Sequence, residues 1–476
     1  MSSNKLFIIV IPIIAIAIGL FLIFNHFFHN EANILSKPDQ IILVTLDTLR
    51  TDHLSIYGYP RPTSPFIDNL AQNSFVFKKA FSSIASTSPS HASIMTSLHP
   101  VTHNVLSNTF KLDSSITTLA EYFKQLQFLT AGFVSTNRHF KPCNLDQGFD
   151  VFNEQPYDER FYRPANETVD ETLQWLRRRK PKSRYFLWVH LFDPHTPYSP
   201  PEEMRQSMHL TSPQEKKEFI QYLKEVQKVD IAYYNNEEEL LNTYENYDAE
   251  IFFVDQQVKR LYQFIMNNKL AEKSLWIITS DHGEGLGNHR WAGHGKHIYN
   301  EQINVLMMFH FSWTNRAGLE IYDITEHVDI FPTITELLNK PLKLNYKFAG
   351  FSLIPLIQQR NHFFAAKYAF SQRRHFNFKP QKIIHEKTDY EDGVKFSLQD
   401  RSYKYIFRSA HIDEFYDLSK DPYETYNLID IPIPERDKMR KILFALREYY
   451  REGGKFSKEE ISQEAIERLK ALGYIQ

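Results

Sequence analysis

Carboxylate and imidazole side chains, the groups best suited to hold a metal, occur at three distant points of the chain. Asp47 stands at the first, the segment 190–195 brings His190 and His195 at the second, and Asp281-His282 form the third. Singly such residues are ordinary, because an aspartate at a strand end usually caps a helix or forms a turn. Together they predict a metal site whose oxygen and imidazole ligands suit Zn²⁺ or Mn²⁺, or Ca²⁺ where carboxylates dominate.

A hydroxyl-rich segment, residues 86–98, supplies a candidate nucleophile. Pro89 fits the first turn of a helix, and the apolar positions after it have helical spacing. The Thr87 hydroxyl would then lie at a helix N-terminus, where backbone N–H groups and the helix dipole favour an alkoxide or the oxyanion of a bound ester. A metal bound to the same oxygen would lower its pKa further. On these residues alone, an ordinary Ser/Thr N-cap is the commoner explanation.

Four short apolar runs, typical of strands buried on both faces, are expected to position these groups. They cover residues 41–46, 129–134, 185–191 and 275–280. Amphipathic stretches between them, such as 115–126, 167–178 and 247–267, predict helices, so the fold class is α/β. Ligands bind beyond the carboxyl ends of the strands in open parallel sheets. Because three of the runs end at the clusters named above, these clusters should meet at one edge of one sheet.

The chain divides into two parts. We predict a catalytic domain over residues 39–360 and a smaller α+β C-terminal subdomain over residues 361–476, with short strands at 395–398 and 403–408 and a helix at 436–452. The charged stretch 202–239 predicts a solvated helical insertion. A substrate lid is the alternative for this stretch, since long insertions are sometimes lids.

The N-terminal segment predicts a membrane anchor. Residues 6–28 carry no charged side chain, and about 20 apolar residues suffice to cross a bilayer as a helix. The run exceeds the apolar core of a secretory signal peptide and is not followed by a small-residue cleavage site. Lys5 before it favours a cytoplasmic stretch 1–5, a transmembrane helix 6–28 and a tether 29–38. The catalytic domain would then be extracytoplasmic, in the periplasm or at the cell surface.

Composition excludes some classes of function. The 55 basic and 57 acidic residues leave a formal charge of −2, which argues against nucleic acid binding through a broad basic face. Cys143 is the single cysteine, so the chain has neither an internal disulfide framework nor a multi-cysteine zinc site.

Motifs in order along the chain resemble those of the sulfatase family in the alkaline-phosphatase superfamily. The segment 44–54, followed by Tyr57-Gly58-Tyr59, resembles the opening motif of sulfatases, and residues 87–97 are similar to their signature C/S-x-P-S-R-x-x-x-x-T-G. Residues 190–198 resemble H-x-x-D-P-H-x-P-Y, and residues 280–295 resemble the second metal motif. Shorter similarities follow at 147–150, 247–250, 415–422 and 471–474.

This resemblance implies a mostly parallel sheet sandwiched by helices, a smaller C-terminal α+β lobe, and hydrolysis or transfer of sulfate or phosphate esters at one divalent metal. By position, the metal ligands would be Asp47, Thr87, Asp281 and His282. Thr87 would be the nucleophile, and His195 and His294 would contact the transferred group or protonate the leaving oxygen, which is typically worth about 10²- to 10⁴-fold. Further candidates for the substrate pocket are His190, His289, Asn108 and Lys296.

Three departures from the family pattern change the expected chemistry. Thr87 stands where sulfatases carry Cys or Ser for oxidation to formylglycine. Because oxidation of a secondary alcohol gives a ketone, no formylglycine is expected. His91 replaces the arginine of the signature. Thr48 replaces a second aspartate and His282 replaces an asparagine, so the site favours Mn²⁺ or Zn²⁺ over Ca²⁺.

These observations predict a membrane-anchored, metal-dependent sulfatase-family hydrolase or group transferase with Thr87 as nucleophile. Its partners would be sulfated or phosphorylated small molecules, glycans or lipid headgroups. Two alternatives stay open. One is a catalytically inactive sulfatase-fold binding or scaffold protein, which the departures at Thr87 and His91 favour. The other is a phosphoethanolamine-type headgroup transferase, because enzymes of that type use a plain threonine and are membrane-anchored.

Overall fold

The structure is a computed structural model that describes residues 36–156, 160–181, 183–314, 318–341, 343–344, 346–359, 367–374 and 393–452. The predicted anchor 6–28, its cytoplasmic flank 1–5, most of the tether and the closing motif 471–474 lie outside the described residues. Within the described ranges, no helix is both long and apolar enough to cross a bilayer. The anchor therefore stays a prediction.

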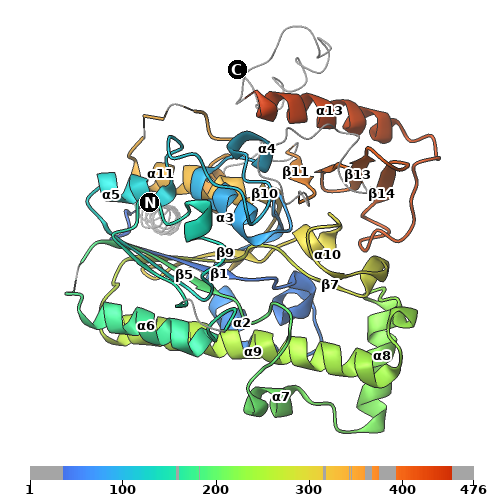
Figure 1. Ribbon diagram of the computed structural model, residues 1–476, viewed down its shortest axis with the longest axis horizontal. Helices are drawn as coiled ribbons and strands as arrows, with labels where there is room; N and C mark the ends of the chain where they lie inside the picture. Colours follow the sequence, from blue (N-terminus) through green and yellow to red (C-terminus); the bar gives the residue numbers. More distant parts are fainter. Residues whose placement is uncertain are drawn as a thin grey trace, which may run out of the picture.

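A mixed sheet lies at the centre of the described chain (Figure 1), in the strand order β10-β2-β9-β6-β1-β5-β3-β4. Its strands are β1 (Gln40–Leu46), β2 (Phe75–Phe81), β3 (Leu129–Val134), β4 (Val151–Asn153), β5 (Tyr185–Leu191), β6 (Ser274–Ser280), β9 (Met307–Phe311) and β10 (Leu319–Glu326). The four strands predicted from the sequence are the adjacent, mutually parallel β6, β1, β5 and β3. The sheet is mixed because β9 runs antiparallel to both of its neighbours.

Helices cover both faces of this sheet (Figure 1). Ile42 and Val44 of β1 pack in one apolar cluster with α2 (Pro65–Ala71), α6 (Ala165–Arg177) and α9 (Glu237–Asn267). Ile41 and Leu43 pack in a second cluster with α3 (Thr87–Thr96), α5 (Leu119–Gln125) and α11 (Ile330–Leu338). Successive side chains of a strand point to opposite faces, so the unbroken apolar run of β1 serves both clusters.

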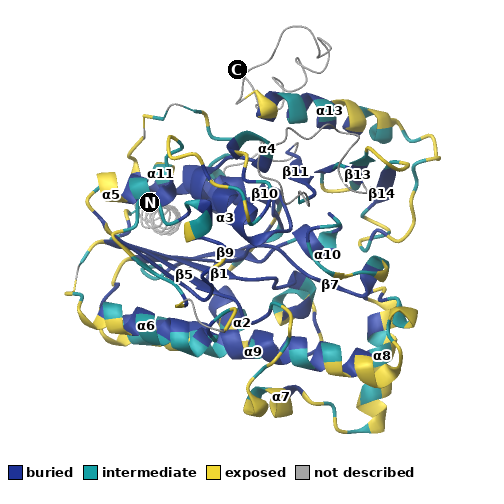
Figure 2. Ribbon diagram, in the orientation of Figure 1, coloured by how far each residue is buried: buried dark blue, intermediate teal, exposed yellow. Residues whose placement is uncertain are grey.

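The predicted helices form, with changed ends. The helix predicted at 115–126 begins at Leu119, because Thr118 and Glu121 form a capping box. The helix predicted at 247–267 begins at Glu237, where Asn236 caps it. The charged stretch 202–239 contains α7 (Glu202–Met208) and α8 (Pro213–Glu225), which pack on α9 and are largely exposed (Figure 2). This stretch is therefore helical, as predicted.

A second, smaller lobe follows. It holds an antiparallel sheet of β11 (Ala369–Gln372), β12 (Lys395–Gln399), β13 (Tyr403–Arg408) and β14 (Glu414–Asp417), packed against α13 (Pro434–Arg451). Ser371 Oγ donates to Ser82 O, and Gln372 N donates to Ser83 O. These bonds attach β11 to the loop that precedes α3. Other short elements include α4 (Pro100–His103), α10 (Asn300–Ile303), α12 (Ile354–Ile357), β7 (Gly285–Leu286) and β8 (Ala292–Gly293).

Candidate active site

The register of the central strands places two aspartates side by side. Leu46 at the end of β1 pairs with Ser280 at the end of β6, so Asp47 and Asp281 each emerge one residue beyond the paired strands. The hydrogen bonds continue past the strand ends, since Asp47 N donates to Leu191 O at 2.9 Å and Asp281 N donates to Leu46 O at 3.3 Å. Leu46 also pairs with Leu191 at the end of β5, so backbone pairing aligns the strand ends of all three clusters predicted to converge.

The turn after β1 orients the Asp281 carboxylate. Thr48 has a φ of 53°, which is unusual for a β-branched residue. In this conformation its backbone N–H donates to Asp281 Oδ1 at 3.2 Å, and the His282 N–H donates to the same oxygen at 2.8 Å. Asp281 Oδ2 is left facing His282 Nε2 at 3.5 Å. His282 Nδ1 donates to Gly283 O at 2.9 Å, which leaves the lone pair of its ring on Nε2.

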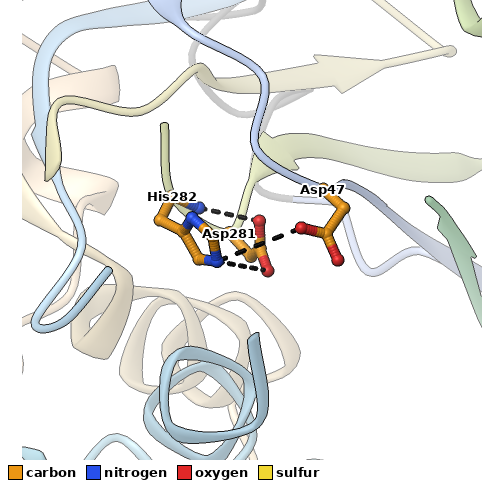
Figure 3. Close-up of side chains that lie close together, drawn as sticks. All are labelled: Asp47, Asp281 and His282. Carbon is orange, nitrogen blue, oxygen red and sulfur yellow. Dashed lines mark hydrogen bonds and ion pairs between the residues drawn. The ribbon is translucent and has the colours of Figure 1, made fainter. Parts of the chain in front are cut away.

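Asp47, Asp281 and His282 form a candidate metal centre (Figure 3). One ligand atom from each residue lies within 4.8 Å of the others, and all three residues are buried. Asp47 Oδ1, Asp281 Oδ2 and His282 Nε2 have no hydrogen-bond partner in the described part of the chain. Burial raises the pKa of Asp47 to about 8, and burial together with Asp47 raises that of Asp281. Two adjacent buried carboxylates need protons or a cation, and this donor set fits Zn²⁺ or Mn²⁺.

Thr87 opens α3 beside this centre. Its Oγ1 lies 3.5 Å from Asp47 Oδ2, on the side of the carboxylate away from His282. Asn108 Oδ1 accepts from Ser88 N at 3.0 Å and from Ser86 Oγ at 3.1 Å, so it holds both neighbours of Thr87. The structure therefore brings Asn108 to the helix N-terminus, where it acts as a cap supplied from another segment.

A buried network lies beneath Thr87 and Asp47. His91 Nδ1 donates to Thr87 O at 2.8 Å, and burial lowers the pKa of His91, so its Nε2 accepts the Thr45 hydroxyl proton at 3.0 Å. Thr45 Oγ1 also receives Trp188 Nε1–H at 3.0 Å. The single hydroxyl proton of Thr45 is given to His91, so His190 Nδ1–H must be the donor in the 2.9 Å bond between His190 and Thr45 Oγ1. The other ring nitrogen of His190, Nε2, faces Asp47 Oδ2 at 3.3 Å. His190 thus supports the metal centre from below.

Three histidines, His282, His294 and His195, form a row that begins at the candidate metal centre. The ring of His294 lies 4.5 Å from that of His282 and 5.0 Å from that of His195. Burial lowers the pKa of His294, but Glu284, 3.2 Å from His294 Nδ1, raises it above the ordinary value. Burial and the charge of His294 lower the pKa of His195 to about 4. Opposite shifts in neighbouring groups favour a proton donor at His294 and a neutral ring at His195.

Two predicted pocket residues have other partners. His289 Nδ1 lies 2.9 Å from Glu301 Oε1, and its Nε2 lies 3.1 Å from Glu424 O. Both partners accept, so the ring is held doubly protonated. Burial lowers the pKa of His289, but Glu301 outweighs it and the pKa rises to about 9. Lys296 Nζ lies 4.6 Å from the centroid of the Trp291 ring. His289 therefore joins the two lobes, and its place in the substrate pocket stays a prediction.

Comparison with known proteins places the chain in a family. The family model described as Sulfatase matches residues 39–340. The chain belongs to the sulfatase family. Arylsulfatase from Clostridium perfringens is 23% identical over an alignment that covers 88% of this chain and 96% of that protein.

Solved structures show that this sulfatase-family chain has the family fold. Phosphonate monoester hydrolase of Agrobacterium radiobacter matches 87% of this chain and 96% of its own, with 20% identity and a TM-score of 0.72. A protein solved in complex with its substrate D-glucosamine-2-N,6-O-disulfate matches 89% of this chain and 100% of its own, with 17% identity and a TM-score of 0.69. An α/β core with a mixed central sheet and a smaller C-terminal β lobe is shared with them.

Three groups in this sulfatase-family site were not assigned a role from the sequence. Glu284 orients His294, and it lies inside the segment 280–295 that resembles the second metal motif of sulfatases. His139 is buried in the loop after β3, and its pKa is lowered by burial and by His195. Because β3 runs parallel to β5, its carboxyl end lies at the same edge of the sheet. The expectation that ligands bind beyond these strand ends could therefore have pointed to His139. Arg374 comes from the second lobe, and no spacing in the sequence connects it to this site.

Proposed function

We propose that this chain is a metal-dependent hydrolase of sulfate- or phosphate-type esters that uses Thr87 as its nucleophile. The observation that carries the proposal is the convergence of Asp47 Oδ1, Asp281 Oδ2 and His282 Nε2 on one buried space, with the Thr87 hydroxyl 3.5 Å from the other oxygen of Asp47. The same residues are implied as ligands by the resemblance to sulfatases, and Zn²⁺ or Mn²⁺ fits them better than Ca²⁺.

The residues of the chain divide the reaction into two steps. When bound, the cation would lower the pKa of the Thr87 hydroxyl and offset the charge of the ester. Deprotonated Thr87 Oγ1 attacks the phosphorus or sulfur atom, and the bond to the leaving oxygen breaks as His294 protonates that oxygen. Water then attacks the group held on Thr87 and gives a proton to His294, and the bond to Thr87 Oγ1 breaks. The product leaves, and both residues return to their starting states.

Esters of phosphorus are the preferred substrates in this proposal. Without formylglycine, the enzyme has no second geminal hydroxyl to expel sulfate from a covalent intermediate, whereas an ester of phosphorus on Thr87 can be hydrolysed directly by water. The structural relative from Agrobacterium radiobacter is a phosphonate monoester hydrolase, which supports this choice. Two of the three relatives described above are named an arylsulfatase and a phosphonate monoester hydrolase, which favours water as the acceptor over the alcohol of a headgroup transferase.

The decisive experiment uses the full-length protein in detergent. We expect bound Zn²⁺ or Mn²⁺ by elemental analysis and metal-dependent turnover of aryl phosphates or phosphonates. Turnover should be lost in Thr87→Ala and retained in part in Thr87→Ser, which keeps a hydroxyl. Mass spectrometry of the Thr87 peptide after rapid acid quenching should show a phospho-adduct. A metal-free protein that turns over neither phosphorus nor sulfate esters would instead favour the binding or scaffold alternative.

The proposal also places residues 6–28 across a membrane, with the catalytic domain outside the cytoplasm. Its support is the long uncharged apolar run at the start of the sequence. Glycans or lipid headgroups bearing sulfate or phosphate would then be the accessible substrates. The full-length protein should sediment with membranes and resist extraction by high salt, whereas a chain beginning at Asn30 should not. Equal amounts of both proteins in the soluble fraction would contradict the anchor.

A further inference from the structure

Arg374 reaches the active site from the second lobe. It lies two residues beyond the end of β11, the strand attached to the loop that precedes α3. Its own backbone N–H donates to Gly295 O at 3.2 Å. Gly295 directly follows His294 in the chain, so this bond places the Arg374 backbone beside the row of histidines formed by His282, His294 and His195.

The stem of the Arg374 side chain lies across Gly295. A Cβ atom placed on Gly295 would lie 3.0 Å from Arg374 Cδ and 3.4 Å from Ala85 O, and Gly295 has a φ of +89°. Ala85 is two residues before Thr87. Glycine at position 295 therefore lets the stem of Arg374 pack against the chain beside His294, at a residue that also lies close to the segment carrying the proposed nucleophile.

The charge of Arg374 acts on the outer part of the site. It contributes to lowering the pKa of His139 and opposes the rise in the pKa of His294, after the larger effects of burial and Glu284. Arg374 is half-buried and stays charged at all working pH values. Because the stem of Arg374 packs on Gly295, the residue after His294, its positive charge lies near the residue that would protonate the leaving oxygen.

We propose that Arg374 forms an anion subsite, which binds a second negatively charged group carried by the leaving part of the substrate. This inference rests on the proposed ester hydrolysis, because the leaving side is defined by His294. The guanidinium fork suits a planar or tetrahedral oxyanion, so the second group is a carboxylate, sulfate or phosphate. The enzyme would therefore prefer polyanionic esters, such as acidic or multiply sulfated or phosphorylated glycans, over esters with a neutral leaving group.

A matched pair of substrates tests the subsite. Phenyl phosphate and 4-carboxyphenyl phosphate share the transferred group and differ in one carboxylate on the leaving ring. In Arg374→Gln, kcat/KM for the carboxylated ester should fall by about 10- to 100-fold, and for phenyl phosphate by less than about 3-fold. Arg374→Lys should recover part of the difference, because it keeps the charge but loses the fork. Arg401→Gln, an exposed arginine of the same lobe, should leave both values unchanged.

Binding measurements keep the test valid in the absence of turnover. Benzenesulfonate and 4-sulfobenzoate form an unreactive pair that again differs in one carboxylate. Calorimetry with the full-length protein should show tighter binding of 4-sulfobenzoate, by about 10-fold or more, and loss of that advantage in Arg374→Gln. A wild-type protein without turnover but with this advantage would overturn the proposed hydrolysis and keep the subsite. Equal losses for both members of a pair, or no loss, in a variant with an unchanged melting temperature would overturn the subsite.

Discussion

The floor and the rim of the active site are held in different ways. The floor, consisting of Asp47, Asp281 and His282, is fixed by the pairing of adjacent parallel strands and lies wholly inside the first lobe. The proposed rim, consisting of Arg374 and the predicted pocket residue His289, depends on contacts between the two lobes. Backbone register thus determines where the proposed metal ligands meet, whereas lobe packing determines where His289 and Arg374 lie. We expect the floor to govern turnover and the rim to govern substrate choice and lobe stability.

The largest effect should come from the floor. Asp281→Asn leaves Asp47 as the one carboxylate of the floor and can turn an amide N–H toward the cation, so metal content should fall and turnover should drop by at least about 10³-fold. Elemental analysis and kinetics of the same preparation check both results. Asp170→Asn, which changes an exposed aspartate paired with Arg260, is the matched control and should be unaffected. Normal metal content in Asp281→Asn would remove this residue from the floor.

The network beneath the floor should matter for folding. His91→Ala leaves the Thr87 carbonyl and the Thr45 hydroxyl without their buried partner, so the free energy of unfolding should fall by about 1–3 kcal/mol. Denaturant titration measures this loss. His411→Ala removes an exposed histidine and should change stability by less than about 0.5 kcal/mol. Equal stability of the two variants would show that His91 is not part of the structural support.

Removal of the metal should make the stability of the protein depend on the protonation of Asp47 in the floor, and therefore on pH. The folded pKa of Asp47 is about 8, above its ordinary 3.8, so between these values the folded state binds more protons than the unfolded state. The metal-free protein should therefore lose stability as pH rises from about 4 to 8, with a fall of a few °C in melting temperature. Differential scanning calorimetry after chelation checks this slope. Restoring Zn²⁺ or Mn²⁺ should flatten it, and an unchanged slope would contradict the proposed ligands.

The smallest effect concerns the rim. His289 has a folded pKa of about 9, above its ordinary 6.5, so its contribution to stability is complete below about pH 6.5 and is lost as pH rises through about 9. We expect about 1 kcal/mol from this contact, since part of the attraction is screened. Melting curves of the wild type and His289→Gln should converge at pH 9 and above and separate at pH 6.5. Parallel curves over this range would argue against a charged contact between the lobes.

The same contrast explains what could be predicted from the sequence. Strands β1, β3, β5 and β6 are unbroken apolar runs, so their positions and the meeting of Asp47 with Asp281 followed from periodicity and the rule about strand ends. β2 and β10 were missed because charged residues interrupt them; Lys78 and Lys79 of β2, for example, are only half-buried. The place of Arg374 could not be predicted, because it depends on how the sheets of the two lobes pack against each other.

The register of β1 and β6 also limits how the length of this chain can vary. Asp47 and Asp281 are opposite each other only because Leu46 pairs with Ser280. Insertion or deletion of one residue within β1 would bring Leu46 or Thr48 to the position of Asp47, and within β6 it would bring Ser280 or His282 to the position of Asp281. The side chains between the change and the strand end would also turn to the opposite face. Apolar exchanges in these strands keep the register. Insertions and deletions should therefore be tolerated in exposed segments such as the one containing α7 and α8, and excluded from β1 and β6.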